Sequence, residues 1–120
     1  MTTTKRTPVA SRALLDRQVS EADLQAAVLD LAKRLNYLVY HVYDSRKSGP
    51  DKGFPDALLA RDGRVLAFEF KRERGVVSLA QHEWIYHLSA GGQIECYILR
   101  PHDLSSGRIE AILKGEEKAA

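Results

Sequence analysis

Apolar residues recur at helical spacing in two stretches of the chain. The first begins at Ser20, which has the spacing of a capping box with Asp23. Its apolar stripe consists of Leu24, Val28, Leu31 and Leu35. Glu21 lies in the first turn on the flank of this stripe, so we expect its side chain at the border of core and solvent.

The second helical stretch begins at Ser78, with Gln81 as its capping-box partner, and ends at Gly91-Gly92. Its apolar side is formed by Leu79, Trp84, Ile85 and Leu88. A third, shorter helix is expected from about Ser106 to Leu113.

Between the helical stretches, runs rich in β-branched and aromatic residues predict strands. The expected strands cover residues 37–42, 56–60, 65–71 and 94–99. Asp62-Gly63 is a strong hairpin turn between the second and third strands. Loops follow at 44–55 and 72–77. The order is helix, three strands, helix, strand, helix, which predicts an α/β fold with a central mixed sheet flanked by helices.

The length and composition indicate one domain. The chain has 120 residues, with 44% hydrophobic and 28% charged positions and a net charge of +2. We expect a domain over residues 19–115, a flexible polar arm over 1–18 and a charged tail over 116–120.

The single cysteine, Cys96, excludes a disulfide within the chain and favours a reducing compartment. The N-terminal residues contain no signal-peptide pattern, and no apolar run has membrane-spanning length. These features predict a soluble cytoplasmic protein with no membrane partner.

Charged residues gather at one end of the predicted hairpin. Glu69 and Lys71 are two apart on a strand and share a face, whereas Phe68 and Phe70 point to the other face. Asp56 lies six residues before Asp62, and Glu69 lies six residues after Gly63. Folding at the turn therefore brings Asp56 and Glu69 opposite each other, within one residue.

Two carboxylates beside a lysine have a chemical use. Paired carboxylates bind a hard divalent cation such as Mg²⁺, and a lysine nearby can stabilise charge that develops on a phosphate. Glu21 can supply a third carboxylate, directly or through water. The alternative is an ordinary solvated face of cross-strand partners. It is weakened because Val65 to Phe68 and Phe70 make both faces of the strand apolar.

These residues resemble a known group. Pro55-Asp56 and Glu69-Phe70-Lys71 match the signature of the PD-(D/E)XK nuclease superfamily, whose restriction-endonuclease-like core is a helix, three strands, a helix and a strand. Within it the chain is most similar to the VRR-NUC group, and less closely to the archaeal Holliday-junction resolvases. The Gly-Phe-Pro-Asp motif and the Ser-Leu-Ala-Gln-His-Glu-Trp helix support the likeness, which spans roughly Ser20 to Pro101.

The resemblance implies roles for individual residues. Asp56 and Glu69 match metal ligands, the Phe70 carbonyl is a possible backbone ligand, and Lys71 matches the catalytic lysine. Glu21 matches the first-helix acid and Gln81 the glutamine near the site. For Gln81 a purely capping role is equally open.

Basic and hydroxyl residues flank the motif in two loops and are candidate contacts to the DNA backbone. They are Ser45, Arg46, Lys47, Ser48, Lys52, Arg72 and Arg74. Plain solvated loops are the alternative. Trp84 is expected in the core, although an exposed edge can stack a base. His41 is expected to be an ordinary core or surface histidine, and the four histidines show no zinc spacing.

Taken together, the motifs predict an endodeoxyribonuclease that depends on Mg²⁺ or Mn²⁺ and needs no organic cofactor. By resemblance, its substrate is branched or Holliday-junction DNA and its assembly a homodimer. Three alternatives stay open. They are a non-catalytic DNA-binding module with a nuclease fold, a sequence-specific restriction or homing endonuclease, and an interaction protein with a salt-bridged surface.

Overall fold

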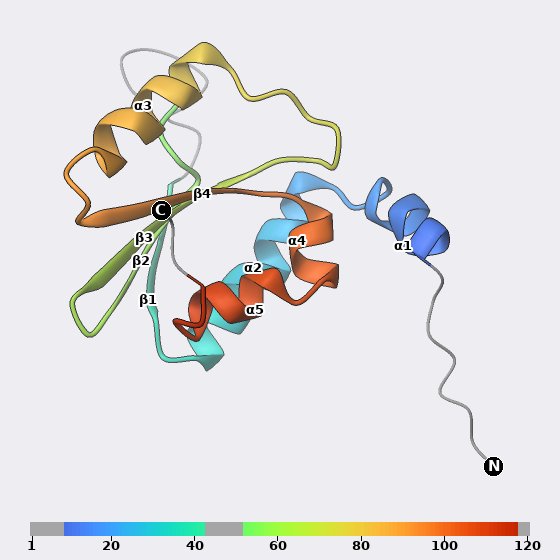
Figure 1. The fold of residues 1–120 in the computed structure, drawn as a ribbon, viewed down its shortest axis with the longest axis horizontal. Coiled ribbons are helices and arrows are strands. Elements are labelled where there is room, and N and C mark those ends of the chain that lie inside the picture. The colour runs from blue at the N-terminus through green and yellow to red at the C-terminus, as the bar shows by residue number, and fades with distance from the viewer. Residues whose placement is uncertain (1–8, 43–51, 118–120) are drawn as a thin grey trace.

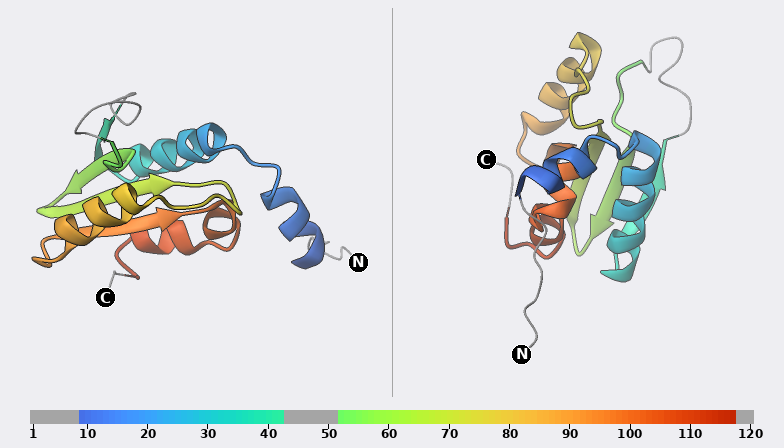
Figure 2. Two further views of the ribbon diagram at one scale, coloured as in Figure 1. Left: turned by 90° about the horizontal axis from the view of Figure 1, so that it is seen from above. Right: turned by 90° about the vertical axis from the view of Figure 1, so that its right-hand side faces the viewer.

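The described residues, 9–42 and 52–117 of a computed structural model, form a four-stranded mixed sheet with helices on both faces (Figures 1 and 2). The strands lie in the order β1-β2-β3-β4; the first three are antiparallel and β4 runs parallel to β3. Their bounds are β1 Leu38–His41, β2 Ala57–Arg61, β3 Arg64–Phe70 and β4 Ile94–Leu99. The predicted α/β class with a mixed sheet is confirmed.

The hairpin between β2 and β3 turns where the sequence predicts. Asp62 and Gly63 have φ values of 50° and 82°, and the flanking Arg61 and Arg64 pair directly. Two consecutive residues with positive φ match the twist of the flanking strands, which is why Asp-Gly is favoured there.

The parallel strand β4 requires a crossover, which α3 (Leu79–Ser89) supplies. The Ser78 hydroxyl accepts from the Gln81 amide and the Gln81 side chain accepts from the Ser78 amide, so the predicted capping box is confirmed. Ser20 likewise caps α2 (Glu21–Arg34) by accepting from the Asp23 amide at 3.0 Å.

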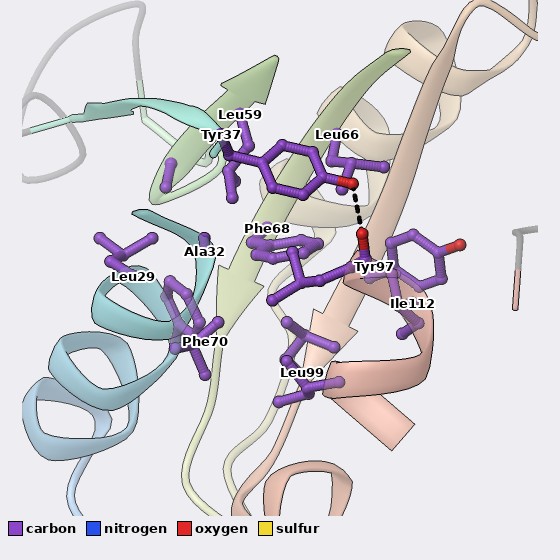
Figure 3. Packing of buried hydrophobic residues seen from close by; sticks show 14 of the residues in the cluster. Leu29, Ala32, Tyr37, Leu59, Leu66, Phe68, Phe70, Tyr97, Leu99 and Ile112 are labelled. Atoms are coloured by element: carbon purple, nitrogen blue, oxygen red, sulfur yellow. Dashed lines mark hydrogen bonds between the residues drawn. The ribbon is translucent and has the colours of Figure 1, made fainter. Parts of the chain in front are cut away.

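Successive side chains of β3 point to opposite faces of the sheet, and the two faces differ in what covers them. Leu66, Phe68 and Phe70 are at most 1% exposed and pack with β4 against α2 and α5 (Arg108–Leu113) (Figure 3). Burying such side chains contributes about 1.5–3 kcal/mol each. The other face, which carries Glu69, is turned toward α3, on the opposite side of the sheet from α2, α4 and α5 (Figure 1).

The ends of the domain differ from the expectation. The segment predicted as a flexible arm contains α1 (Val9–Asp16), and residues 1–8 lie outside the described part. The Ser105 hydroxyl donates to Asp16 at 3.0 Å, which ties α1 to α4 (Pro101–Ser105). A contact between residues so distant along the chain leaves no local pattern.

The helix expected over about 106–113 is α5, and the preceding helix α4 was not predicted. Pro101, expected only to end the strand, opens α4 in its first turn, where a proline costs no hydrogen bond. Within the described ranges, no helix combines the length and the apolar character needed to cross a membrane.

Candidate active site

The two acids face each other at the open end of the β2–β3 hairpin. Ala57 pairs with Phe68, so the next positions outward along the same register are Asp56 and Glu69. Their exposed fractions are 2% and 1%. The predicted proximity is confirmed, and the alternative of a solvated charged face is wrong because neither side chain is in solvent.

Backbone hydrogen bonds from both neighbouring strands hold Asp56. The Phe70 amide donates to its Oδ2 at 2.7 Å, and the Val42 amide donates to its carbonyl oxygen at 2.8 Å. A hydrogen bond from a backbone donor to a carboxylate oxygen fixes the orientation of the side chain. Asp56 is thus fixed between the ends of β1 and β3.

Gln81 connects the helix cap to the acid pair. Its Nε2 donates to Glu69 Oε2 at 3.1 Å, while its Oε1 accepts from the Ser78 amide at 2.9 Å. Both roles left open by the sequence are therefore present in the geometry. Gln81 is buried, whereas Leu79, expected on the apolar side of this helix, is 88% exposed. The other three residues of the expected apolar side, Trp84, Ile85 and Leu88, are half-buried.

Lys71 continues the line of β3. Its amide donates to the Leu99 carbonyl at 2.9 Å, and alternation places its side chain on the face of Glu69. The side chain is 9% exposed, and its Cδ lies 3.5 Å from the position that a Cβ on Gly75 would occupy. The loop after Lys71 therefore covers the aliphatic stem of the lysine.

The donor chemistry suits a hard cation. Carboxylate and carbonyl oxygens are the ligands that Mg²⁺ prefers, and one or two carboxylates suffice because the ion keeps several waters. Asp56, Glu69 and the Phe70 carbonyl are such donors. In the described ranges no three His, Cys, Asp or Glu gather as a metal-holding group, so Glu21, half-buried in the first turn of α2, is not gathered with the acid pair.

Next to this site, α2 is tied to β1 through a histidine. His41 Nε2 and Gln25 Nε2 lie 2.7 Å apart and form a hydrogen bond. Gln25 is one helical turn after Glu21, and His41 pairs with Ala57 at the start of β2. The histidine that the sequence left without a special role thus helps to set the position of the first turn of α2.

The predicted DNA contacts divide into two groups. Ser45, Arg46, Lys47 and Ser48 lie outside the described residues. Lys52, Arg72 and Arg74 are described and exposed. Arg17, just after α1, lines a hollow of about 280 Å³ together with Arg72 and Arg74. Arg17 was not predicted, because its place depends on how α1 packs.

Arg100 is a second residue that sequence reasoning missed. Its Nη1 donates to the carbonyl oxygens of Arg72, Glu73 and Gly75 at 2.8, 3.1 and 2.8 Å. Glu73 also accepts from the amide of His102 at 3.1 Å. The start of α4 therefore holds the loop that follows Lys71.

Compared with known proteins, the chain matches no family model, no curated protein and no solved structure. The likeness to the VRR-NUC group accordingly stays a prediction from the motifs.

Proposed function

We propose that the chain is a metal-dependent endodeoxyribonuclease centred on Asp56, Glu69 and Lys71. The observation that carries the proposal is the pair of carboxylates, at most 2% exposed, on one face with a buried lysine. Removing two carboxylates from water is costly unless charge and hydrogen bonds compensate. A divalent cation between the two carboxylates would offset the cost of burying both charges, which accounts for their being paired.

Each residue of the candidate site would have a different role. Asp56, Glu69 and the Phe70 carbonyl would hold the cation, and Gln81 orients the Glu69 carboxylate through its 3.1 Å hydrogen bond. When bound, such an ion lowers the pKa of water and offsets negative charge on a phosphate. The Lys71 ammonium adds positive charge where the transition state accumulates negative charge. Glu21 would contribute through water rather than as a direct ligand.

The fold supports the family assignment within this proposal. The elements α2, β1, β2, β3, α3 and β4 follow one another in the order of the restriction-endonuclease-like core. The membership of the VRR-NUC group, a branched or Holliday-junction substrate and a homodimer follow from the motif resemblance. The rival DNA-binding module lacks a use for the buried acids, since phosphate contacts need only positive charge.

The test is cleavage of labelled DNA as a four-way junction, a flap, a plain duplex and single strands, with Mg²⁺, Mn²⁺ or chelator. We expect metal-dependent cutting that each of two substitutions reduces by about 10²-fold or more: Asp56→Asn because it weakens the hold on the cation, and Lys71→Ala because it removes a positive charge from the reacting phosphate. Arg34→Ala is the matched control, since Arg34 forms an exposed pair with Asp30 at 2.8 Å. DNA binding without cutting, unchanged by either substitution, would establish the non-catalytic module instead.

A further inference from the structure

A hollow of about 420 Å³ lies between α3 and the chain at Lys52, the first described residue before Asp56. Its lining consists of Lys52, Ala80, Glu83, Trp84 and His87. The four α3 residues are spaced so that they share one face of the helix. The hollow therefore has a helical wall with an aromatic ring, an acid and an imidazole, and a lysine opposite.

Two contacts fix the loop against this helix. Gly53 has φ +92°, and a Cβ there would lie 2.6 Å from the Ala80 carbonyl carbon, so the backbones touch. Phe54 packs edge-to-face on Trp84 with ring centroids 4.9 Å apart. The walls of the hollow are consequently set by packing and exist without a ligand.

Both segments that line the hollow also lead to the acid pair along the chain. Ala80 precedes Gln81, which donates to Glu69. Lys52 and Phe54 lead directly into Asp56. A group held in the hollow would thus be a neighbour of a phosphate held at the acids.

The lining favours a nucleobase over other groups. Aromatic side chains are stacking platforms for bases of any sequence. Glu83 can accept a hydrogen bond from an N–H group on the edge of a base, such as N3–H of thymine, whereas its charge disfavours a phosphate in the same place. Lys52 suits the phosphate next to the base. The volume is at the lower end of the range for small-molecule sites, about 300–1,000 Å³, which suits one base and not a duplex.

We propose that this hollow binds one unpaired base of the DNA, stacked on Trp84, beside the phosphate to be cut. The inference rests on the proposed nuclease function and narrows its substrate class. Cleavage would favour DNA in which unpaired nucleotides adjoin a duplex, over a fully paired duplex.

The chain offers a direct reporter, because Trp84 is its single tryptophan. A short thymidine oligonucleotide is titrated into the protein in the presence of chelator, so that the measurement does not depend on cleavage. The intrinsic tryptophan fluorescence is recorded. An abasic oligonucleotide of equal length and charge is the matched probe, and an end label on each gives binding by anisotropy. We expect quenching by thymidine and none by the abasic strand. Equal quenching by both, or none by either, would overturn the proposal.

Variants on one helix supply the second measurement. Trp84→Leu should weaken thymidine binding by about 5- to 150-fold, the range corresponding to loss of one stacked base, and leave abasic binding unchanged. Trp84→Phe keeps a ring and should retain most of the affinity. Tyr86→Leu is the control, because Tyr86 is a 67% exposed aromatic outside the hollow. Equal loss in Trp84→Leu and Tyr86→Leu would contradict a base site at Trp84.

The two proposals fail separately. If no DNA is cut with any metal but thymidine quenches Trp84, the base site stands and the nuclease function falls. If DNA is cut but thymidine neither quenches nor depends on Trp84, the base site falls and the nuclease function stands.

Discussion

At the residue scale, Gly53 has the closest backbone contacts of the glycines that the structure describes. It combines a positive φ with backbone contact to Ala80, whereas Gly92 has φ +76° and nothing within 4 Å of its Cβ direction. Alanine at either site bears the left-handed penalty of about 1–2 kcal/mol. Gly53→Ala must in addition displace the start of α3, so it should lower the free energy of unfolding clearly more than Gly92→Ala.

Urea denaturation of the two variants beside the unmodified protein measures this difference. Equal losses would mean that the loop from Lys52 to Asp56 shifts away from α3 at no cost, and that the walls of the base hollow are not rigid.

The residues of the acid pair were predictable because the rules that place them are local. A turn at Asp62-Gly63 fixes the register, and a period of two fixes the face, which brings Asp56 opposite Glu69. Arg100 was not predictable, since its three acceptors lie more than twenty residues earlier and are backbone atoms with no side-chain signal.

At the element scale, the start of α4 acts as a clamp on the loop after Lys71. Arg100→Ala removes three hydrogen bonds from a charged donor to the carbonyls of this loop. Bonds to charged groups contribute about 1.5–3 kcal/mol, and we expect a total loss in that range because the donor is partly exposed. Amide exchange in residues 72–75 should quicken while the exchange of β2 and β3 is unchanged.

Native-state hydrogen exchange checks this expectation. Arg34→Ala, which breaks an exposed pair within α2, should change stability by less than about 0.5 kcal/mol. Unaltered exchange at 72–75 in Arg100→Ala would show that the loop is held by other contacts.

Among the elements, those with their own caps and periodicity were predicted, and those held by distant contacts were not. α2, α3 and the β2–β3 hairpin carry Ser20, Ser78 and Asp62-Gly63 as local signals. α1 and α4 are short and depend on each other through Ser105 and Asp16. Such helices are marginal alone, so their stability comes from packing.

At the scale of the whole molecule, Arg64 joins the sheet to the C-terminal helix at the end remote from the acids. It forms two hydrogen bonds with Glu95 on β4, at 2.6 and 2.9 Å, and donates to the Ile112 carbonyl at 2.7 Å. The Tyr37 hydroxyl donates to the Leu113 carbonyl beside it at 2.7 Å (Figure 3). Glu95 raises the pKa of Arg64 above its usual value, so the guanidinium stays charged at every pH below the ordinary arginine range.

Arg64→Met should therefore lower the free energy of unfolding by about 3 kcal/mol. The Glu95 side chain is only 17% exposed, and the substitution removes the arginine that is its charge partner there. The raised pKa implies stability that is present below the ordinary arginine pKa and lost only above it. The loss in Arg64→Met should accordingly be similar at pH 7 and pH 9 in urea denaturation.

Lys114→Met is the control, because Lys114 forms an exposed ion pair with Glu110 on α5. This substitution should change the free energy of unfolding by less than about 0.5 kcal/mol. If Arg64→Met lowered the free energy of unfolding no more than Lys114→Met, the sheet and α5 would be joined by apolar packing alone.

The placement of both acids on one hairpin also bears on how the chain folds. Hairpins close in about 1–10 μs, whereas a parallel pairing across a crossover has more chain to close and forms later. We therefore expect Asp56 and Glu69 to come together before the parallel strand is added. Gln81 reaches Glu69 only when α3 docks, so we expect the electrostatic cost of burying this carboxylate to fall on the later, slower step of folding.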